Sequence, residues 1–448
     1  MVPGVLRVRG VTAVSSRRRA LLQAIAGAPL LVGGASPCAA EGRVLRAGPD
    51  DYRAVLAGLR AGDTLRLSRG QYRQGLPLHG LKGTAAAPIG IEGPRDGSAV
   101  FVARPRHNTV SIVDSAHVHV RDLTLDGRNQ PVDAVKAEGH ARFASHVVLQ
   151  RLRIVGHGAH QSLVGISTMC SAWGWQILDN TIVGAGTGMY LGHSSGNAPF
   201  WDGLIAGNRI INPIGYGVQI KHQLVRPAFD EAPAQTARTV LRGNVIVKGN
   251  GASTGERARP NLLLGHFPLA GAGSEDLYLV HGNLLYDNPT EALMQAEGRL
   301  RVYNNLLVNP HGDALRLLAH HDRPRDVAAF HNSIVAAGIG IELAAPQVGD
   351  VHTVHRNLVY SEQNPGVLDR RSNRVAPFSH ASLELVQPLS ELGELDLAPR
   401  GALASPTEPL PVDLQALPDA AVDYLGRRRS RDMPGACLPT GAGSVACR

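Results

Sequence analysis

The sequence predicts an all-β protein, a right-handed parallel β-helix with an N-terminal capping helix, from three observations. Among 448 residues there are 51 Gly but only 7 Phe, 9 Tyr and 3 Trp, too few large rings for a compact aromatic core. Short segments rich in Val, Ile and Asn recur, for example at 118–125, 175–183 and 240–247, and several alternate with period two. A polar residue, usually Asn, separates two apolar pieces in each segment.

These polar residues mark the repeat. Successive marks lie 22 to 39 residues apart, which suits one coil made of three short strands and their turns. Asn stacked in one slot can donate to and accept from the amides of neighbouring coils. The marks are Asn180, Asn208, Asn244, Asn283, Asn305, Asn332 and Asn357, with Asp122 and Leu152 placed in the same slot upstream.

Residues 1–40 are predicted to be an export signal. Arg17, Arg18 and Arg19 precede an apolar stretch, 20–33, and then small residues up to Ala40. This pattern resembles a twin-arginine signal, so we expect a periplasmic or secreted protein without a membrane span in its mature form. The segment carries five Arg and no acid, and its removal lowers the formal charge from +8 to +3, which argues against nucleic acid as a partner.

The β-helix is predicted to occupy 41–375 and a Pro-rich cover segment 376–448. Asp50 or Asp51 can cap a short helix whose apolar residues, Tyr52 to Leu59, would close the first coil. In an oxidising compartment Cys437 and Cys447 can close a short loop, which leaves Cys170 as a buried apolar residue. We expect a monomer.

The opening of the predicted β-helix also resembles a known family. Gly62-Asp63-Thr64 through Gly70-Gln71-Tyr72-Arg73, then Gly80 to Thr84 and Ala87 to Ile89, is similar to the start of pectin-lyase-like β-helix proteins, and among them to the alginate lyase and chondroitinase B group. The resemblance implies the right-handed β-helix fold and makes a lyase acting on an acidic polysaccharide the leading hypothesis. It also makes calcium a candidate cofactor, although the compact Asn and double-Glu pattern that holds calcium in that group is missing here.

The two longest steps of the repeat, 36 and 39 residues, are adjacent, so their extra residues should form neighbouring loops on one side of the coil. In this zone three matched segments, 188–193, 217–222 and 261–266, each end in His: His193, His222 and His266. If Met189, Val218 and Leu262 point inward, alternation turns Tyr190, Gln219 and Leu263 outward. Lys221 would then stand outward between two glycines.

A uronate lyase needs a group that neutralises the substrate carboxylate, a base for the adjacent carbon and an acid for the leaving oxygen. Lys221 is our candidate for the base, because burial or nearby cations can lower the pKa of a lysine. His222 is a candidate acid or metal ligand, and Tyr190 a proton donor or a stacking surface for a sugar. Arg226 is the first candidate for pairing with the carboxylate. Further substrate contacts are assigned to His193, His266, Trp201, Arg257 and Arg259.

Alternatives remain open at this point. The parity that turns Lys221 outward sends the three histidines inward, as a structural ladder, unless the chain bends there. Lys221 is also compatible with a solvated surface charge, and the site with a non-catalytic polysaccharide-binding or structural protein. A glycoside hydrolase is a further alternative, since 156–158 and 219–221 resemble two polygalacturonase motifs, but the paired aspartates that such chemistry requires are missing.

Overall fold

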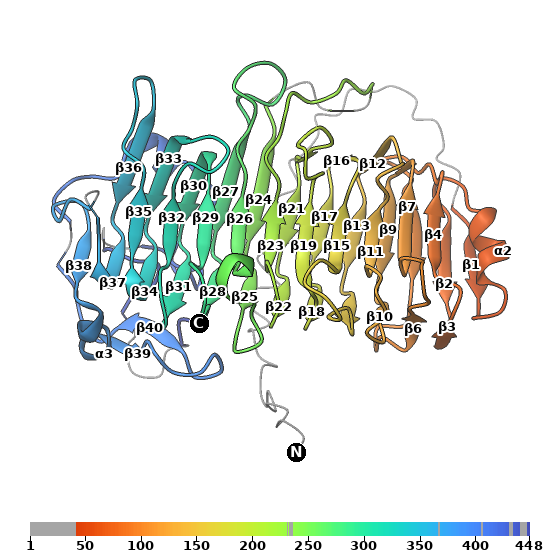
Figure 1. Ribbon diagram of the computed structural model, residues 1–448, viewed down its shortest axis with the longest axis horizontal. Coiled ribbons are helices and arrows are strands. Elements are labelled where there is room, and N and C mark those ends of the chain that lie inside the picture. Colours follow the sequence, from red (N-terminus) through yellow and green to blue (C-terminus); the bar gives the residue numbers. More distant parts are fainter. Residues whose placement is uncertain are drawn as a thin grey trace.

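The computed structural model describes residues 42–230, 232, 236–365, 368–404, 406–429, 433–439 and 446–448. The predicted export signal lies outside the described residues. Over the described residues the chain winds into a right-handed parallel β-helix, drawn horizontally in Figure 1 with the N-terminal coils in red and orange. No helix among these residues is long and apolar enough to cross a lipid bilayer.

Three long parallel sheets run along the described part of the coil, and a short fourth sheet lies beside the N-terminal coils. Each sheet takes one strand per coil, and strands of successive coils pair in parallel. Sheet A contains β1 Val44–Ala47, β2 Thr64–Leu67, β5 Ile89–Glu92, β9 Val118–Arg121, β13 Val148–Gln150, β17 Gln176–Leu178, β21 Leu204–Ala206, β24 Arg238–Arg242, β27 Leu277–His281, β30 Gly298–Tyr303, β33 Pro324–Phe330 and β36 Val351–His355. Sheet B contains β3 Gly70–Tyr72, β6 Ala99–Val102, β10 Thr124–Asp126, β14 Arg153–Val155, β18 Thr181–Val183, β22 Arg209–Ile211, β25 Val245–Val247, β28 Leu284–Tyr286, β31 Leu306–Asn309, β34 Ser333–Ile339, β37 Leu358–Gln363 and β38 Arg374–Ala376.

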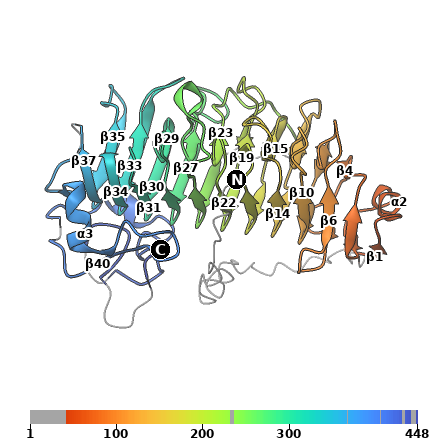
Figure 2. The ribbon, with the colours of Figure 1, turned by 60° about the horizontal axis from the view of Figure 1, so that its bottom comes forward.

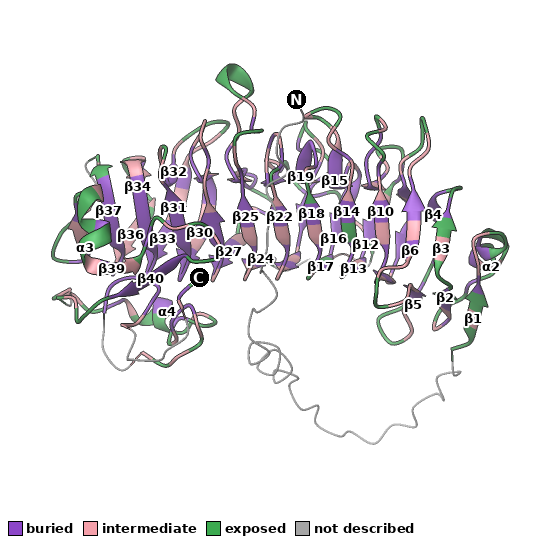
Figure 3. Ribbon diagram, turned by 90° about the horizontal axis from the view of Figure 1, so that it is seen from below, coloured by how far each residue is buried: buried purple, intermediate pink, exposed green. Residues whose placement is uncertain are grey.

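Sheet C carries the candidate site, and sheet D lies next to its N-terminal half. Sheet C contains β4 Leu76–His79, β7 Val110–Val113, β11 Val135–Ala137, β15 Val164–Thr168, β19 Thr187–Leu191, β23 Val218–Ile220, β26 Leu262–Leu264, β29 Met294–Ala296, β32 Leu315–Leu317 and β35 Ile341–Leu343. Sheet D contains β8 Ser115–Ala116, β12 Phe143–Ser145, β16 Ser171–Trp173 and β20 Phe200–Trp201. Figure 3 shows how buried positions follow one another along the stacked strands.

The predicted Asn column is confirmed as a ladder of hydrogen bonds. From Asn180 to Asn357 each side chain donates through Nδ2 to Oδ1 of the Asn in the next coil, over 2.9–3.0 Å. The same Oδ1 accepts the backbone N–H of the preceding Asn, and Nδ2 also donates to a carbonyl, as in Asn244 to Ile205. The sequence pattern missed an eighth member, Asn373, whose Oδ1 accepts from Asn357 Nδ2.

One placement in this column was wrong by a residue. Asp122 lies in the slot before the column, together with Arg151 and Asp179, and all three have positive φ of 53° to 61°. The ladder position in that coil therefore belongs to Leu123, which is 1 % exposed. Asp122 pairs with Arg151 over 2.6 Å instead of entering the ladder. The left-handed corner explains why Gly fills this slot in later coils, for example Gly243 with φ 63°.

The first coil is closed by the helix α2 Tyr52–Ala57, which buries Tyr52 and Leu56 as expected. The ring of Tyr52 packs edge-on against Tyr72, with ring centroids 5.1 Å apart. Asp51 occupies the N-cap position, but its carboxylate accepts from Gly48 N rather than from the helix.

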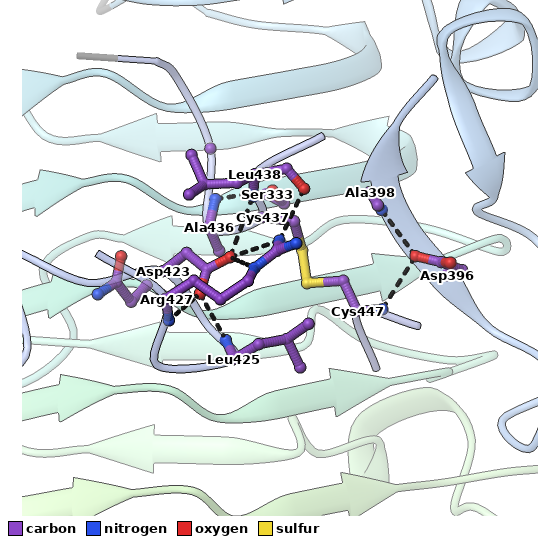
Figure 4. Close-up of a disulfide and its surroundings, with 12 residues drawn as sticks. Ser333, Asp396, Ala398, Asp423, Leu425, Arg427, Ala436, Cys437, Leu438 and Cys447 are labelled. Atoms are coloured by element: carbon purple, nitrogen blue, oxygen red, sulfur yellow. Dashed lines mark hydrogen bonds and ion pairs between the residues drawn. A yellow bond between two sulfur atoms is a disulfide. The ribbon is translucent and has the colours of Figure 1, made fainter. Parts of the chain in front are cut away.

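The C-terminal segment folds back over the outside of the later coils, at the lower left of Figure 2. It contains η2 Phe378–His380, α3 Ala381–Glu384, the antiparallel pair β39 Leu385–Gln387 and β40 Asp396–Pro399, and α4 Val412–Gln415. Its apolar residues, including Leu385 and Leu397, pack on Val308 and Tyr360 of sheet B. Cys437 and Cys447 form the predicted disulfide, which Figure 4 shows beside the bonded pair Asp423 and Arg427. Cys170 is buried and unpaired by any disulfide.

The repeat spacing predicted that the long insertions emerge on one side of the coil. In the structure they emerge on two sides. The segments 221–230 and 265–276 leave the carboxyl ends of β23 and β26 and rise at the top of Figure 1. The loop 248–261, which contains η1 Gly255–Arg257, instead precedes β26 and enters from the opposite edge of sheet C. Sheet C is therefore flanked by insertions along both edges in its central coils.

Candidate active site

The outer face of sheet C carries the predicted row of side chains. Strand pairing aligns Tyr190 with Gln219, and Gln219 with Leu263. Their neighbours Met189 and Val218 are fully buried inside the coil, which confirms the predicted alternation. Tyr190 and Leu263 are partly exposed, whereas Gln219 is only 3 % exposed.

Lys221 stands in the next column, directly after β23. Its backbone N donates to Leu191 O, and Gly265 N donates to Ile220 O, so Gly192, Lys221 and Gly265 occupy matched positions in three coils. A Cβ on Gly192 would lie 3.4 Å from Lys221 Cβ, and one on Gly265 would lie 2.2 Å from His222 N. The glycines on both sides therefore let the chain pass close to Lys221, as the sequence had indicated.

The surroundings of Lys221 act on its pKa in opposite directions. Partial burial lowers the pKa of the ammonium from its ordinary value, and the negative charge of Glu297 raises it by a smaller amount. Glu297 follows Gly265 in the same column, is 2 % exposed, and accepts the backbone N–H groups of His321 and Asp322 at 3.0 Å each. Burial is the larger effect, so the structure favours the neutral amine more than water does.

Three histidine rings are grouped in the region of Lys221, whose charge acts on His222 and His321. His222 stacks on His266 with ring centroids 5.5 Å apart, and its ring is tilted against that of His321 with centroids 4.4 Å apart. Burial, then the neighbouring His321, Lys221 and His266, lower the pKa of His222 to about 4. His222 is therefore neutral at physiological pH, and His266 directs its Nδ1 to Phe267 O at 2.8 Å.

The inward histidine ladder, which the sequence left open, is absent from the described residues. The strands end at Leu191, Ile220 and Leu264, so each His lies beyond the strand and outside the core. Gly192, with φ 91°, bends the chain at this point. His193 lies apart from the other two histidines: its Nδ1 contacts Ser195 Oγ at 2.8 Å.

Tyr190 lies on the same face as Lys221. Burial raises the pKa of its phenol from the ordinary value, and Tyr216 raises it further. The phenol therefore keeps its proton at neutral pH, while Lys221 is biased towards giving its proton up. Two groups with pKa values displaced in these directions are suited to act as acid and base respectively.

Arg226 and Trp201 are not available to a substrate in this structure. The side chain of Arg226 is 5 % exposed and pairs with Asp276 over 3.1 Å. Trp201 is 1 % exposed, stacks on Trp173, and lies under the guanidinium of Arg226, 5.4 Å from its ring centroid. Phe229, in the segment after β23, explains part of this burial, because its ring stacks on Trp173 and belongs to the same apolar cluster as Trp201.

Arg257 and Arg259 come from the loop on the opposite edge of sheet C. Arg257 is exposed, and its carbonyl accepts from Gln161 Nε2. Arg259 lies over the ring of Tyr216, 5.7 Å from the centroid, and its carbonyl accepts from Lys248 Nζ at 2.6 Å. These arginines therefore flank the end of the face opposite to Lys221, near Tyr190 through Tyr216.

Sequence reasoning missed His321 and assigned no role to Gln219. His321 lies two residues further along its coil than the matched histidines, so the repeat spacing concealed it. Gln219 is recognisable only from the structure: it stands beside Tyr190 in the row and its Oε1 is buried without a hydrogen-bond partner among the described residues.

The residues around Lys221 do not fit a calcium site. Among the described residues no three His, Cys, Asp or Glu side chains are grouped so that they could hold a metal ion. Glu297 is the carboxylate beside Lys221, and both of its oxygens already accept backbone N–H groups. Calcium prefers several oxygen ligands, which this donor set lacks.

Comparison with known proteins gives structural likenesses only. No family model matches the sequence, and no curated protein matches it. An alginate lyase from Paenibacillus sp. str. FPU-7 is 16 % identical, with a TM-score of 0.45, over 71 % of this chain and 99 % of that one. A lacto-N-biosidase of family GH136 from Eubacterium ramulus is 13 % identical, with a TM-score of 0.47, over 75 % and 68 %.

A polysaccharide lyase of family PL6 from Pseudopedobacter saltans is 10 % identical, with a TM-score of 0.41, over 74 % of this chain and 91 % of that one. A shared fold does not determine the chemistry of a site, so the function has to be argued from the residues on sheet C.

Proposed function

We propose that this protein is a polysaccharide lyase that cleaves uronate-containing chains by β-elimination on the outer face of sheet C. The observation that carries the proposal is the pair Lys221 and Tyr190: a lysine with a lowered pKa and a tyrosine with a raised pKa on one face of the coil. A hydrolase would need two working carboxylates, and Glu297 is the carboxylate beside Lys221, with both oxygens engaged.

In the proposed reaction the neutral amine of Lys221 removes the proton from C5 of the uronate unit. The electron pair of that C–H bond forms the C4=C5 double bond, and the bond from C4 to the glycosidic oxygen breaks. Tyr190 donates its phenolic proton to this oxygen. No oxidant, reductant or water is consumed, and the product carries an unsaturated uronate at its new end.

Acidification of C5 requires partial neutralisation of the uronate carboxylate. Arg257 takes this role in place of Arg226, because Arg257 is exposed on the loop at the edge of sheet C whereas Arg226 is buried and paired with Asp276. Gln219 lies beside Tyr190 but is only 3 % exposed, so we assign it no direct contact with the substrate.

The test is ultraviolet absorbance of the unsaturated uronate when the protein is mixed with alginate, polygalacturonate or glycosaminoglycans. We expect cleavage of one of these polymers, abolished in Lys221→Ala and strongly reduced in Tyr190→Phe. Lys82→Ala is the matched control, because Lys82 lies far along the chain and contacts the ring of Phe143. Polymer binding without product in the unaltered protein would favour a non-catalytic polysaccharide-binding protein.

In this proposal the protein acts outside the cytoplasm, and it acts as a monomer. The Cys437–Cys447 disulfide supports the location, since such bonds persist in oxidising compartments. Fractionation of cells with and without Arg17 and Arg18 would test the twin-arginine-like signal, and retention of both forms in the cytoplasm would contradict export.

A further inference from the structure

A polar cavity lies on the same face of sheet C as the candidate site, near the N-terminal end of the coil. It has a volume of about 330 Å³ and is lined by β4, β7 and the turn that follows β6. Three arginines line it, from two separate segments: Arg53 on α2, and Arg104 and Arg106 in the turn after β6. Glu138 is the carboxylate in the lining, so the guanidinium groups outnumber it three to one.

The three arginines differ from most of their kind in this protein. None of them forms an ion pair among the described residues, whereas Arg151, Arg226 and many others are paired with Asp or Glu. Arg104 Nε is buried and has no hydrogen-bond partner within the described part of the chain. A buried donor that lacks a partner is costly, and an acceptor from a ligand would remove that cost.

The remaining lining is arranged by hydrogen bonds around Glu138. Its Oε1 accepts from Asn108 Nδ2 and Ser111 Oγ, at 2.9 Å each, and His79 Nε2 contacts the same Ser111 Oγ at 3.0 Å. The carboxylate of Glu138 is therefore engaged in hydrogen bonds with Asn108 and Ser111. Arg106 holds a left-handed conformation, with φ 67°, in the turn 104–107, which a backbone bridge between Arg104 and His107 closes.

The register of sheet C connects this cavity with the candidate active site. Strand pairing aligns Ser111 with Lys136, Lys136 with Ser167, and Ser167 with Tyr190. The outward row therefore runs from the cavity to Tyr190 without a change of face. Four strand steps separate β4 from β19, which at about 4.8 Å each span roughly 19 Å. This is a distance that several consecutive sugar units bridge.

We propose that this cavity is a remote subsite that binds the carboxylate of a uronate unit in the same polymer whose cleavage takes place at Lys221. The inference rests on the proposed function for the identity of the polymer. Arg104 and Arg106 supply the charge-assisted hydrogen bonds, and Arg53 adds positive charge. The site favours long substrates, because a short oligosaccharide at Lys221 does not reach it.

The binding experiment uses the Lys221→Ala protein, so that nothing is consumed. Calorimetry measures the affinity for long oligosaccharides and for trisaccharides of alginate, polygalacturonate and hyaluronan. Replacing Arg104 and Arg106 by Gln should lower the affinity for the long ligand about tenfold or more and leave the trisaccharide affinity within about twofold. Arg106→Gln alone, at an exposed position, should cause part of the loss without disturbing the fold.

Arg95→Gln is the matched control, because Arg95 is exposed on the turn between β5 and β6, away from sheet C. A parallel kinetic experiment keeps Lys221 and should show the same dependence of kcat/KM on substrate length. If the Arg variants match the control on long substrates while the unaltered protein cleaves them, the subsite is wrong and the lyase stands. If nothing is cleaved but long ligands still bind through these arginines, the lyase is wrong and the subsite stands. If no ligand binds, both are overturned.

Discussion

Glu297 lies two coils beyond Lys221 in one column of sheet C, and the position between them is Gly265. No side chain separates the two charged groups along that column, and Glu297 raises the pKa of Lys221 against the effect of burial. The carboxylate is held by backbone N–H groups of His321 and Asp322, so its place does not depend on Lys221. Glu297 therefore influences the pH at which Lys221, the proposed base, loses its proton.

Glu297→Gln should therefore shift the pH dependence of cleavage. Without the carboxylate the pKa of Lys221 falls further below 10.5, so the neutral amine persists to lower pH. The acidic limb of kcat/KM against pH should move to lower pH, measured with the polymer that the protein cleaves. An unchanged acidic limb in a folded, active variant would separate Glu297 from the base. Glu256→Gln, in the exposed loop 248–261, serves as the control.

Gly265→Ala should impair both the fold near the site and its activity. The added Cβ would lie 2.2 Å from His222 N and 2.7 Å from Lys221 C, so the backbone of the preceding coil has to shift. Gly251→Ala is the comparison, because a Cβ there meets nothing within 4 Å. We expect a lower Tm and at least a tenfold loss of kcat/KM for the first variant only, in line with the sensitivity of catalysis to small displacements. Equal behaviour of the two variants would contradict the close packing described here.

Stability should fall as the pH drops below about 6.5. Burial lowers the pKa values of His157, His222 and His331, so between the folded and unfolded pKa values the unfolded chain binds more protons. The free energy of unfolding then decreases as the pH falls through that window. His331→Asn removes one titrating group and keeps a residue that tolerates φ 53°. Its Tm should depend less on pH than that of the unaltered protein, and a parallel dependence would exclude His331 as a contributor.

The Asn ladder should be most sensitive in its interior. Asn244→Ala deprives the backbone N–H and Nδ2 of Asn208 of their acceptor and removes one donor from Ile205 O. A cost of roughly 1–3 kcal/mol for each stranded group is expected in urea unfolding. Asn373→Ala, at the end of the ladder, removes the same kind of acceptor from Asn357, but its own Nδ2 donates only in partly buried bonds, to Val354 O and Asp369 O, and to no further Asn, so it should cost less. If both substitutions cost the same, the ladder does not act as a connected column.

The sequence was sufficient for the coil and for the parity of 188–266, because a repeated Asn and a period-two pattern report directly on strand register. It was insufficient where the chain leaves the strands. The side on which an insertion emerges depends on whether the extra residues precede or follow a sheet C strand. The spacing between successive Asn residues gives only the total number of residues in a coil, so it does not show on which side of the strand the extra residues lie. Arg226 looked available for this reason, since the pattern does not contain its partner Asp276, fifty residues away.

The same distinction applies to the candidate site: positions on the strands were predictable from the sequence, and positions beyond the strand ends were not. Tyr190 lies on sheet C at a strand position whose direction alternation predicts, and Lys221 directly follows the strand β23. His193, His222 and His266 share a repeat position but not an environment, because Gly192 turns the chain and Ser195 engages the first of them. In the sequence, Gln219 was marked only by the period-two alternation, which predicts that its side chain points outward.

The C-terminal segment gives the two halves of the rod different mechanical characters. Among the described residues, coils before β25 have no member in the apolar cluster beneath the C-terminal segment, so a pull from the N-terminus can peel them off in small steps, each at the cost of few interfaces. The later coils are held by hydrogen bonds to the C-terminal segment on their outer face. Tyr303 Oη donates to Pro418 O, and Asn304 Nδ2 donates to Asp419 O, and in each bond the two residues are 115 positions apart in the chain. These coils have to yield together, and a stretching experiment on the intact chain should record a series of small releases followed by one large rupture.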